Sequence, residues 1–324
     1  MKSYLSIFLI LGLALPVFAY RPITDDKLQE LVQSFQYTPT VKQIRTSKAS
    51  CQGQDIEFST TYPQRDSELT IKAKTFIPVN LAIKVPVIFM LPPLGGASSL
   101  DVLIGKRFCE NNLAAFIITT NLTGLNSDEL VPVTDHDHTH RRVASALKGA
   151  LIVAGTYPEI NTQKAGLFGI SLGGILGSVA YSVIPELSAA TLFVNGGDVP
   201  HILAVSDQVP VVNLKKARMQ EQGFTTVEQY EAFLNDHLEI DPMHFVKMVN
   251  PETVKLYLSN NDKSVPTVDQ INYYNAIGKP VETKFSSLGH METVLSVLAV
   301  GTGKQQIADW FHSRFARPNP RIRH

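Results

Sequence analysis

The sequence predicts an α/β fold with a mostly parallel central sheet and helices on both faces. Short apolar runs typical of strands alternate along the chain with longer stretches that favour helices. Some of these runs, such as VPVIFML at 85–91, are apolar throughout, as parallel strands buried on both faces are. Hydrophobic residues make up 44% of the 324 residues and charged residues 18%, so the chain can build a large core.

The N-terminal segment at 1–19 is expected to be a secretory signal peptide rather than part of the fold. Lys2 supplies the positive charge, an apolar run of 12 residues covers 4–15, and Ala19 ends a small-residue cleavage site. The alternative is an uncleaved anchor helix, for which this run is short. Cleavage would leave a mature chain at 20–324 without a stable membrane anchor, in the periplasm or the extracellular space.

The first half of the predicted sheet lies between residues 68 and 120. ELTIKAKTFIP at 68–78 alternates apolar and polar residues, as a half-buried strand does. The apolar runs at 85–91 and 113–120 indicate buried strands, with a helix at 98–112 between them. A longer helix is expected at 134–155, with one apolar face formed by Val143, Leu147, Leu151 and Ala154.

The second half repeats the alternation. KAGLFGI at 164–170 and AATLFVNGG at 189–197 are expected strands. The segment between them, 171–184, is small and apolar, as a helix packed closely on a sheet must be. The chain then continues with strands at 254–259 and 281–287 and with helices at 266–277 and 291–316.

One stretch interrupts this alternation. Residues 196–250 place 55 residues between two strands where a single crossover helix would be enough. Much of the stretch is polar, charged and helical in character. We interpret it as a helical cap inserted into one domain at 20–324; a crossover with a longer loop is the alternative.

Charge and cysteine content limit the partners. The chain has 29 Lys and Arg against 29 Asp and Glu, so it lacks the basic balance of a nucleic-acid binder, and we expect no nucleic-acid partner. Two cysteines cannot form a four-cysteine zinc site. Export would permit a bond between Cys51 and Cys109, but the sequence leaves open whether they pair or stay free.

The candidate for chemistry is Ser171, in the G-x-S-x-G pattern of residues 169–173. A predicted strand runs directly into this pattern and a predicted helix leaves it at once. Such a strand–turn–helix elbow holds the serine in a strained conformation with Oγ exposed. Glycines at 169 and 173 remove the Cβ atoms that would clash across the turn. The alternative is a glycine-rich packing turn with an idle serine.

With this elbow, the chain resembles the α/β-hydrolase superfamily over about residues 55–316. The resemblance implies that a nucleophile, an acid and a histidine follow one another in that chain order. It also implies that no metal or organic cofactor is needed. Ser171 would be the nucleophile.

The histidine is expected after the last strand, where His290 lies in SSLGHMET just before the final helix. A Gly-His pair at this position is typical of the family. A base on a loop at the carboxyl end of a strand can reach the serine hydroxyl. A structural helix cap is the alternative role for His290. His312, far along the last helix, and His201, in the cap, are weaker rivals.

The acid is expected after the preceding strand, where Asp262 lies in LYLSNNDKSVP. This resembles the D-x-x-V-P of the family, although Ser259 stands where the family often has glycine. Asp262 would orient His290 and stabilise its charged form. Asp198, after an earlier strand, and Asp269, on a helix, are rivals, and a turn or N-cap role is the alternative for Asp262.

An oxyanion hole needs two backbone N–H groups. The resemblance assigns one to Leu172, the residue after the nucleophile. The other belongs to the loop after the strand at 85–91, which reads PPLGG where the family often has His-Gly. Proline has no N–H, so Leu94 is the candidate donor rather than Pro93.

Three histidines, at positions 136, 138 and 140, form a dense cluster with two aspartates. In a helix, His136 and His140 would share one face and could bind zinc. We favour a solvated loop and N-cap that lead into a helix at 141–155, and we expect no metal.

Together these residues predict a secreted serine hydrolase that acts on a small-molecule acyl substrate, with a carboxylic ester as the expected bond. A peptidase or an acyltransferase on the same triad is the alternative among enzymes. The Pro92-Pro93 departure keeps open a non-catalytic, hydrolase-like binding protein. Covalent labelling of Ser171 would separate the last class from the others.

Overall fold

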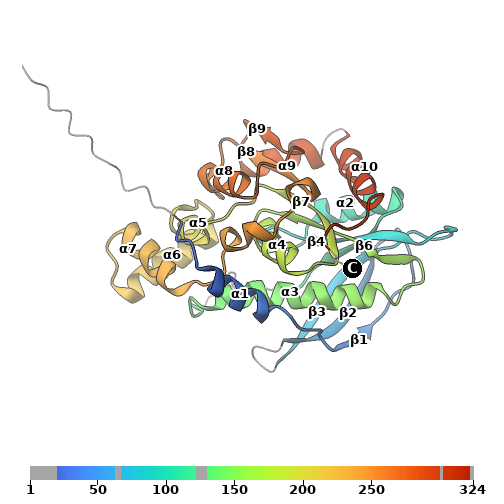
Figure 1. The fold of residues 1–324 in the computed structure, drawn as a ribbon, viewed down its shortest axis with the longest axis horizontal. Coiled ribbons are helices and arrows are strands. Elements are labelled where there is room, and N and C mark those ends of the chain that lie inside the picture. The colour runs from blue at the N-terminus through green and yellow to red at the C-terminus, as the bar shows by residue number, and fades with distance from the viewer. Residues whose placement is uncertain (1–19, 63–66, 122–129, 300–301, 322–324) are drawn as a thin grey trace, which may run out of the picture.

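The computed structural model describes residues 20–62, 67–121, 130–299 and 302–321 (Figure 1). The predicted signal peptide at 1–19 lies outside the described residues. Within them, no helix is long and apolar enough to cross a membrane. The strands are β1 Val41–Arg45, β2 Gln54–Tyr62, β3 Ser67–Phe76, β4 Val85–Leu91, β5 Ala114–Ile118, β6 Ile160–Ile170, β7 Leu187–Phe193, β8 Val254–Ser259 and β9 Lys284–Ser286.

The helices alternate with these strands along most of the chain. They are α1 Asp25–Ser34, α2 Ser99–Glu110, α3 Asp135–Ala154, α4 Leu172–Val183, α5 Val199–Val205, α6 Val209–Gln222, α7 Val227–His237, α8 Thr267–Ala276, α9 His290–Leu298 and α10 Gly303–Phe315. Two short 3₁₀ helices, η2 Pro242–Met248 and η3 Pro251–Thr253, precede β8.

The nine strands of the described chain form one sheet, in the order β1-β2-β3-β5-β4-β6-β7-β8-β9. The six strands from β5 to β9 in this order are parallel, and β1, β2 and β3 extend the sheet with antiparallel pairs. The predicted mostly parallel sheet is therefore confirmed. Because parallel strands end at one edge, β4, β6 and β8 bring their following loops to the same side of the molecule.

Helices cover both faces of the sheet, as predicted (Figure 1). Side chains of α1, α3, α4 and η2 pack on one face around Phe89, Phe116 and Leu167. Side chains of α2, α9 and α10 pack on the other face around Phe168 and Phe193. The sheet is thus buried on both sides, which explains why the central strands β4 and β5 are apolar throughout.

The α5–α7 segment lies between β7 and β8 and extends away from the sheet (Figure 1). Its side chains Ile202, Tyr230 and Leu234 belong to a small apolar cluster, which also includes Ile175 of α4 and Val265 of the loop after β8. Gly223 ends α6 with a φ of 69°, a left-handed conformation that favours glycine. Thr226 begins α7 with a capping box that Gln229 completes.

The structure differs from the sequence-based expectations in its last helix, and it has one helix and two strands that were not predicted. The helix predicted at 291–316 is two helices, because α9 ends at Leu298 and α10 begins at Gly303, where a Cβ would overlap the Val297 carbonyl oxygen. The helix α1 and the strands β1 and β2 have no counterpart in the prediction; β1 is mostly exposed and carries little apolar signal.

The two cysteines form a disulfide, which answers the question that the sequence left open. The Cα atoms of Cys51 and Cys109 lie 5.7 Å apart. The bond joins the turn before β2 to the C-terminal end of α2, across 58 residues of sequence. It therefore anchors an antiparallel part of the sheet to a helix of the core.

Candidate active site

Ser171 lies at a sharp turn between β6 and α4. Its φ of 55° and ψ of −121° place a non-glycine residue in a strained region of backbone space. The Ser171 N–H donates to the Phe193 carbonyl at 2.9 Å, which fixes the turn to the end of β7. The predicted strand–turn–helix elbow is present, and it holds the serine at the carboxyl edge of the sheet.

Glycines make this turn possible. A Cβ on Gly169 would lie 2.5 Å from the Gly173 oxygen. A Cβ on Gly173 would lie 2.5 Å from the Pro92 oxygen and closer still to the Leu91 oxygen. Only glycine at 173 therefore allows the start of α4 to contact the backbone that follows β4.

His290 is the first residue of α9, and it contacts both of the other predicted residues. Its Nε2 lies 2.8 Å from Ser171 Oγ, and its Nδ1 lies 2.6 Å from Asp262 Oδ2. Residues that are 119 and 28 positions apart in sequence thus form one continuous hydrogen-bonded chain. All three side chains are largely buried, with 6–8% of each residue exposed.

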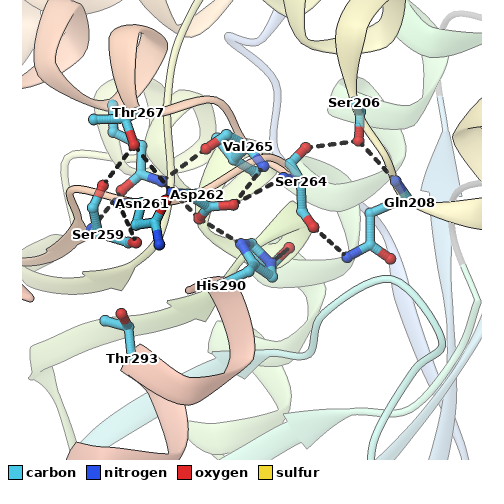
Figure 2. A network of polar contacts seen from close by, with 12 residues as sticks. Ser206, Gln208, Ser259, Asn261, Asp262, Ser264, Val265, Thr267, His290 and Thr293 are labelled. Atoms are coloured by element: carbon cyan, nitrogen blue, oxygen red, sulfur yellow. Dashed lines mark hydrogen bonds and ion pairs between the residues drawn. The ribbon is translucent and has the colours of Figure 1, made fainter. Parts of the chain in front are cut away.

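Asp262 is held by groups of its own loop as well as by His290 (Figure 2). Its Oδ1 accepts from the backbone N–H of Ser264 at 2.8 Å and of Val265 at 3.1 Å. Its Oδ2 accepts from Gln270 Nε2 at 2.7 Å. The carboxylate is therefore fixed in the orientation in which Oδ2 faces the imidazole.

Ser259, the departure from the family pattern, connects the acid loop to the histidine loop. Its hydroxyl donates to the Leu288 carbonyl and accepts from the Asn261 N–H at 3.1 Å. Its own N–H donates to Gln270 Oε1 at 2.9 Å. A serine at this position thus adds a link between two loops, where glycine would add none.

The rival acids and bases have other partners. Asp198 is the N-cap of α5 and accepts from the His201 N–H. The His201 ring pairs with Asp269, with Nδ1 2.9 Å from Oδ2. His312 donates from Nε2 to the Asn111 carbonyl at 2.6 Å. The hydrogen bonds of these four side chains lead away from Ser171.

The solvated loop expected for the histidine cluster is wrong. The cluster forms the first turns of α3, and His140 is only 4% exposed. The cause is packing against the chain that follows α7: the Asp137 carboxylate accepts from the N–H groups of Glu239 and Ile240. Among the described residues, no three His, Cys, Asp or Glu side chains converge in a way that could hold a metal ion.

Burial shifts the pKa values of three side chains in this cluster so that their neutral forms are favoured. It lowers the pKa of His136 to about 4 and that of His140 to about 3. It raises the pKa of Asp137 to about 6. Both imidazoles are therefore neutral at pH 7.

A cavity opens beside Ser171, and most of its wall is apolar. Leu94 and Leu172 both lie in this wall. Leu172 is the first residue of α4, where helix N–H groups have no intrahelical partner. Leu94 lies in a turn that the Gly96 N–H closes by donating to the Pro93 carbonyl at 3.0 Å. The two leucines that the sequence selected as oxyanion donors thus flank the serine.

Sequence reasoning selected the serine, the acid and the histidine but not Gln270. Gln270 lies eight positions after Asp262, on α8, and is fully buried. A buried glutamine on a helix carries no pattern of its own in a single sequence. Its contact with Asp262 depends on how α8 packs against the acid loop.

Comparison with known proteins supports the fold. No protein-family model and no curated protein matches the sequence. Acetyl xylan esterase 1 from Thermoanaerobacterium sp. JW/SL YS485 matches with a TM-score of 0.64 and 13% identity, over 91% of this chain and 95% of that chain. Acetyl xylan esterase from Paenibacillus sp. R4 has a TM-score of 0.62 and 13% identity, over 89% and 92%.

A third similar structure is the alpha/beta hydrolase GrgF from Penicillium sp. sh18. It has a TM-score of 0.56 and 16% identity, over 82% of this chain and 99% of that chain. The likenesses extend over most of both chains in each pair. The chain therefore has the fold of the α/β-hydrolase superfamily.

Proposed function

We propose that this protein is a serine hydrolase that cleaves carboxylic esters of small molecules through an acyl-enzyme. One observation carries the proposal: His290 bridges Ser171 Oγ and Asp262 Oδ2 at 2.8 and 2.6 Å. A hydroxyl is a weak nucleophile until a base takes its proton, and that base works best when a third group orients it. The three side chains supply these three parts.

The reaction begins when Ser171 Oγ attacks the acyl carbon of the ester. His290 Nε2 takes the hydroxyl proton as the new bond forms, and Asp262 stabilises the resulting imidazolium while remaining a carboxylate. The tetrahedral intermediate then loses the alcohol, whose oxygen receives the proton from His290. The products of this half-reaction are a free alcohol and an ester on Ser171.

A negative charge develops on the carbonyl oxygen in the tetrahedral intermediate. Hydrogen-bond donors stabilise this charge best when they are already in position. The N–H groups of Leu172 and Leu94 provide them, and the N-terminal end of α4 adds a favourable partial charge. One such donor contributes a factor of about 10²–10³ to kcat in hydrolases of this type.

Water completes the cycle. His290 takes a proton from the water as its oxygen attacks the acyl carbon, and the intermediate then releases Ser171 Oγ, which receives that proton. The free acid leaves and the enzyme returns to its starting state.

The α5–α7 segment serves as the cap of this site within a single domain at 20–324. Apolar side chains of α5 and α6, Val199, Ile202, Leu203 and Val211, line the cavity beside Ser171. The cap thus forms the wall that contacts the acyl substrate. It is the part of the site in which substrate preference resides.

The protein acts after export, in the periplasm or outside the cell, without a stable membrane anchor. The sequence of residues 1–19 supports this, since it has the charge, length and cleavage site of a signal peptide. The Cys51–Cys109 bond supports it independently, because such bonds persist in oxidising compartments.

Ester cleavage has further support from the names of two similar structures, which are acetyl xylan esterases. A panel of 4-nitrophenyl esters and matched 4-nitroanilides tests it. We expect the mature protein to hydrolyse short esters much faster than the anilides, and Ser171→Ala to lose this activity by several orders of magnitude while its thermal unfolding stays unchanged. Faster anilide cleavage would indicate a peptidase, and an equally active Ser171→Ala variant would exclude the mechanism.

A further inference from the structure

The cavity beside Ser171 is apolar but not uniformly so. Its apolar wall comes from the α4 helix, the cap, the loop after β4 and the loop after β8, and it comprises Leu94, Leu172, Ile175, Leu176, Val199, Ile202, Leu203, Val211 and Val265. The described residues of its lining include no Lys, Arg, Asp or Glu. Besides Ser171, the polar side chains in the lining are Thr139, Ser206, Gln208, Ser264 and the two histidines of α3, His136 and His140.

Four of these polar side chains already have partners in the protein. Ser206 Oγ donates to the Ser264 carbonyl at 2.7 Å, and Gln208 Nε2 donates to Ser264 Oγ at 2.9 Å (Figure 2). Ser264 Oγ in turn donates to Asp207 Oδ1 at 2.8 Å. Thr139 Oγ1 donates to the Asp135 carbonyl at 3.0 Å. These groups need no ligand to satisfy them.

His140 differs from them. It is 4% exposed and lines the cavity, and neither ring nitrogen has a hydrogen-bond partner among the described residues. Buried polar groups of native proteins usually have a partner, so a histidine without one points to a ligand. Nδ1 is sealed inside the protein, which leaves Nε2 as the ring nitrogen for a ligand in the cavity. A neutral imidazole has one donor and one acceptor nitrogen, so Nε2 can bind a hydroxyl or a carbonyl oxygen.

We propose that His140 is a specificity residue that binds a neutral oxygen on the acyl part of the substrate. His136, one helical turn before it, lies in the same wall and completes a polar patch in an otherwise apolar pocket. This inference rests on the proposed function, since it concerns the substrate of that site.

The acyl part, rather than the alcohol, occupies this cavity. Its wall includes Ser171 and both oxyanion donors, Leu94 and Leu172, but His290 is not among the residues that line it. The leaving alcohol must lie next to His290, because His290 gives it a proton. The group on the other side of the carbonyl carbon therefore lies in the cavity.

The lining and the size of the cavity indicate that the substrate oxygen bound by His140 is neutral and that the acyl group is short. A carboxylate in this cavity would have no Lys or Arg in the described lining to pair with, and burying an unpaired charge is very costly. The cavity volume is about 70 Å³, room for about five to seven water-sized groups. A branched four-carbon acyl group with one hydroxyl or carbonyl fits these limits.

Two 4-nitrophenyl esters of the same shape test the proposal. In the 3-hydroxybutanoate a hydroxyl occupies the place that a methyl group has in the 3-methylbutanoate. We expect the wild type to favour the hydroxy ester by at least tenfold in kcat/KM, after each value is divided by the rate of hydroxide hydrolysis. A site built to bind a substrate hydroxyl rejects the analogue that lacks it.

Three variants of α3 complete the test. His140→Leu should reduce the ratio to about one, and His140→Gln should restore part of it. His138→Leu is the matched control: His138 lies on the same helix but pairs with Tyr62 Oη and does not line the cavity, so the ratio should stay high.

Failure of the role proposed for His140 can be distinguished from failure of the proposed hydrolase function. A wild-type ratio near one, or a ratio that His140→Leu leaves high, overturns the role of His140. Faster turnover of the 4-nitrophenyl hemisuccinate than of the hydroxy ester overturns the neutral oxygen. If none of these esters is cleaved and an active-site phosphonate does not label Ser171, the proposed function itself fails.

Discussion

Gln270 Nε2 donates to Asp262 Oδ2 at 2.7 Å, the same oxygen that lies 2.6 Å from His290 Nδ1. The same Gln270 Nε2 also donates to the Val265 carbonyl, at 2.8 Å. Gln270 thus connects the two ends of the acid loop and fixes the carboxylate from the side opposite its backbone partners. Gln270, on α8, thus helps to orient the Asp262 carboxylate toward His290.

Gln270→Met should lower kcat by about tenfold and leave KM nearly unchanged. Methionine fills a similar volume but cannot donate to Asp262, so the carboxylate loses one of its fixed partners. Ester turnover measured over a range of substrate concentrations separates the effect on kcat from the effect on KM.

The control for this variant is Gln306→Met on α10, whose exposed side-chain amide bonds, within the described part of the chain, to Thr302 Oγ1 alone. It should match the wild type in both kcat and KM. An unchanged kcat in Gln270→Met would show that the backbone N–H groups alone hold Asp262.

Much of the fold could be predicted because its signal is local. Continuous apolar strands and the small, apolar stretch at 171–184 reflect burial on both faces of a parallel sheet. The break between α9 and α10 also has a local signal, since Gly301 and Gly303 interrupt the helical sequence, and the prediction of one helix at 291–316 overlooked it. The exposed edge strand β1 carries too few apolar residues to be recognised.

The three residues of the hydrogen-bonded chain were selected because each follows a recognisable strand and parallel strands end at one edge. Gln270 could not be selected, since its role arises only when α8 packs on the acid loop. The environment of His140 was misjudged for a related reason: the sequence shows a polar cluster, and its burial depends on contacts with distant segments, such as the chain after α7 that bonds to Asp137.

Asp262→Asn should reduce kcat by about 10⁴, whereas Asp198→Asn should reduce it far less. Asparagine at 262 would stabilise the wrong tautomer of His290. Asp198 caps α5 instead, and asparagine is about as good an N-cap as aspartate, so this substitution should change neither the chemistry nor the stability much. Kinetics of both purified variants on one ester gives the ranking, and the reverse order would move the acid to the loop after β7.

Gly173→Ala should abolish activity or folding, whereas Gly177→Ala should do neither. A Cβ at 173 would strike the backbone oxygens of Leu91 and Pro92, which cannot move without displacing the Leu94 loop. A Cβ at 177 would meet the end of the Leu167 side chain at 3.0 Å, a contact that a small rotation relieves. Thermal unfolding and ester turnover of both variants measure the difference; comparable losses in the two would argue against a backbone contact specific to 173.

Asp137→Asn should stabilise the protein relative to the wild type as the pH rises from 4 to 7. Burial raises the pKa of Asp137 to about 6, so the favourable contribution of its protonated form is present below about pH 4 and is lost as the pH rises through 6. A shift of about two units corresponds to about 3 kcal/mol. Asparagine stays neutral and keeps an oxygen for the Ile240 N–H, which Oδ1 accepts at 2.8 Å.

Urea unfolding at pH 4 and pH 7 checks this. The free energy of unfolding of Asp137→Asn minus that of the wild type should grow by about 1–3 kcal/mol between the two pH values. A difference that stays constant, or that shrinks, would mean that Asp137 is charged in the folded protein at pH 4.

The most direct test of the central claim is to treat the mature, folded protein with a fluorophosphonate probe and to map the adduct by peptide mass spectrometry. Activation of Ser171 by His290 and Asp262 predicts one covalent adduct, on Ser171, which His290→Ala slows strongly and Ser171→Ala removes. A folded protein that reacts at another serine, or that does not react at all, would contradict the claim that these three residues form a working nucleophile.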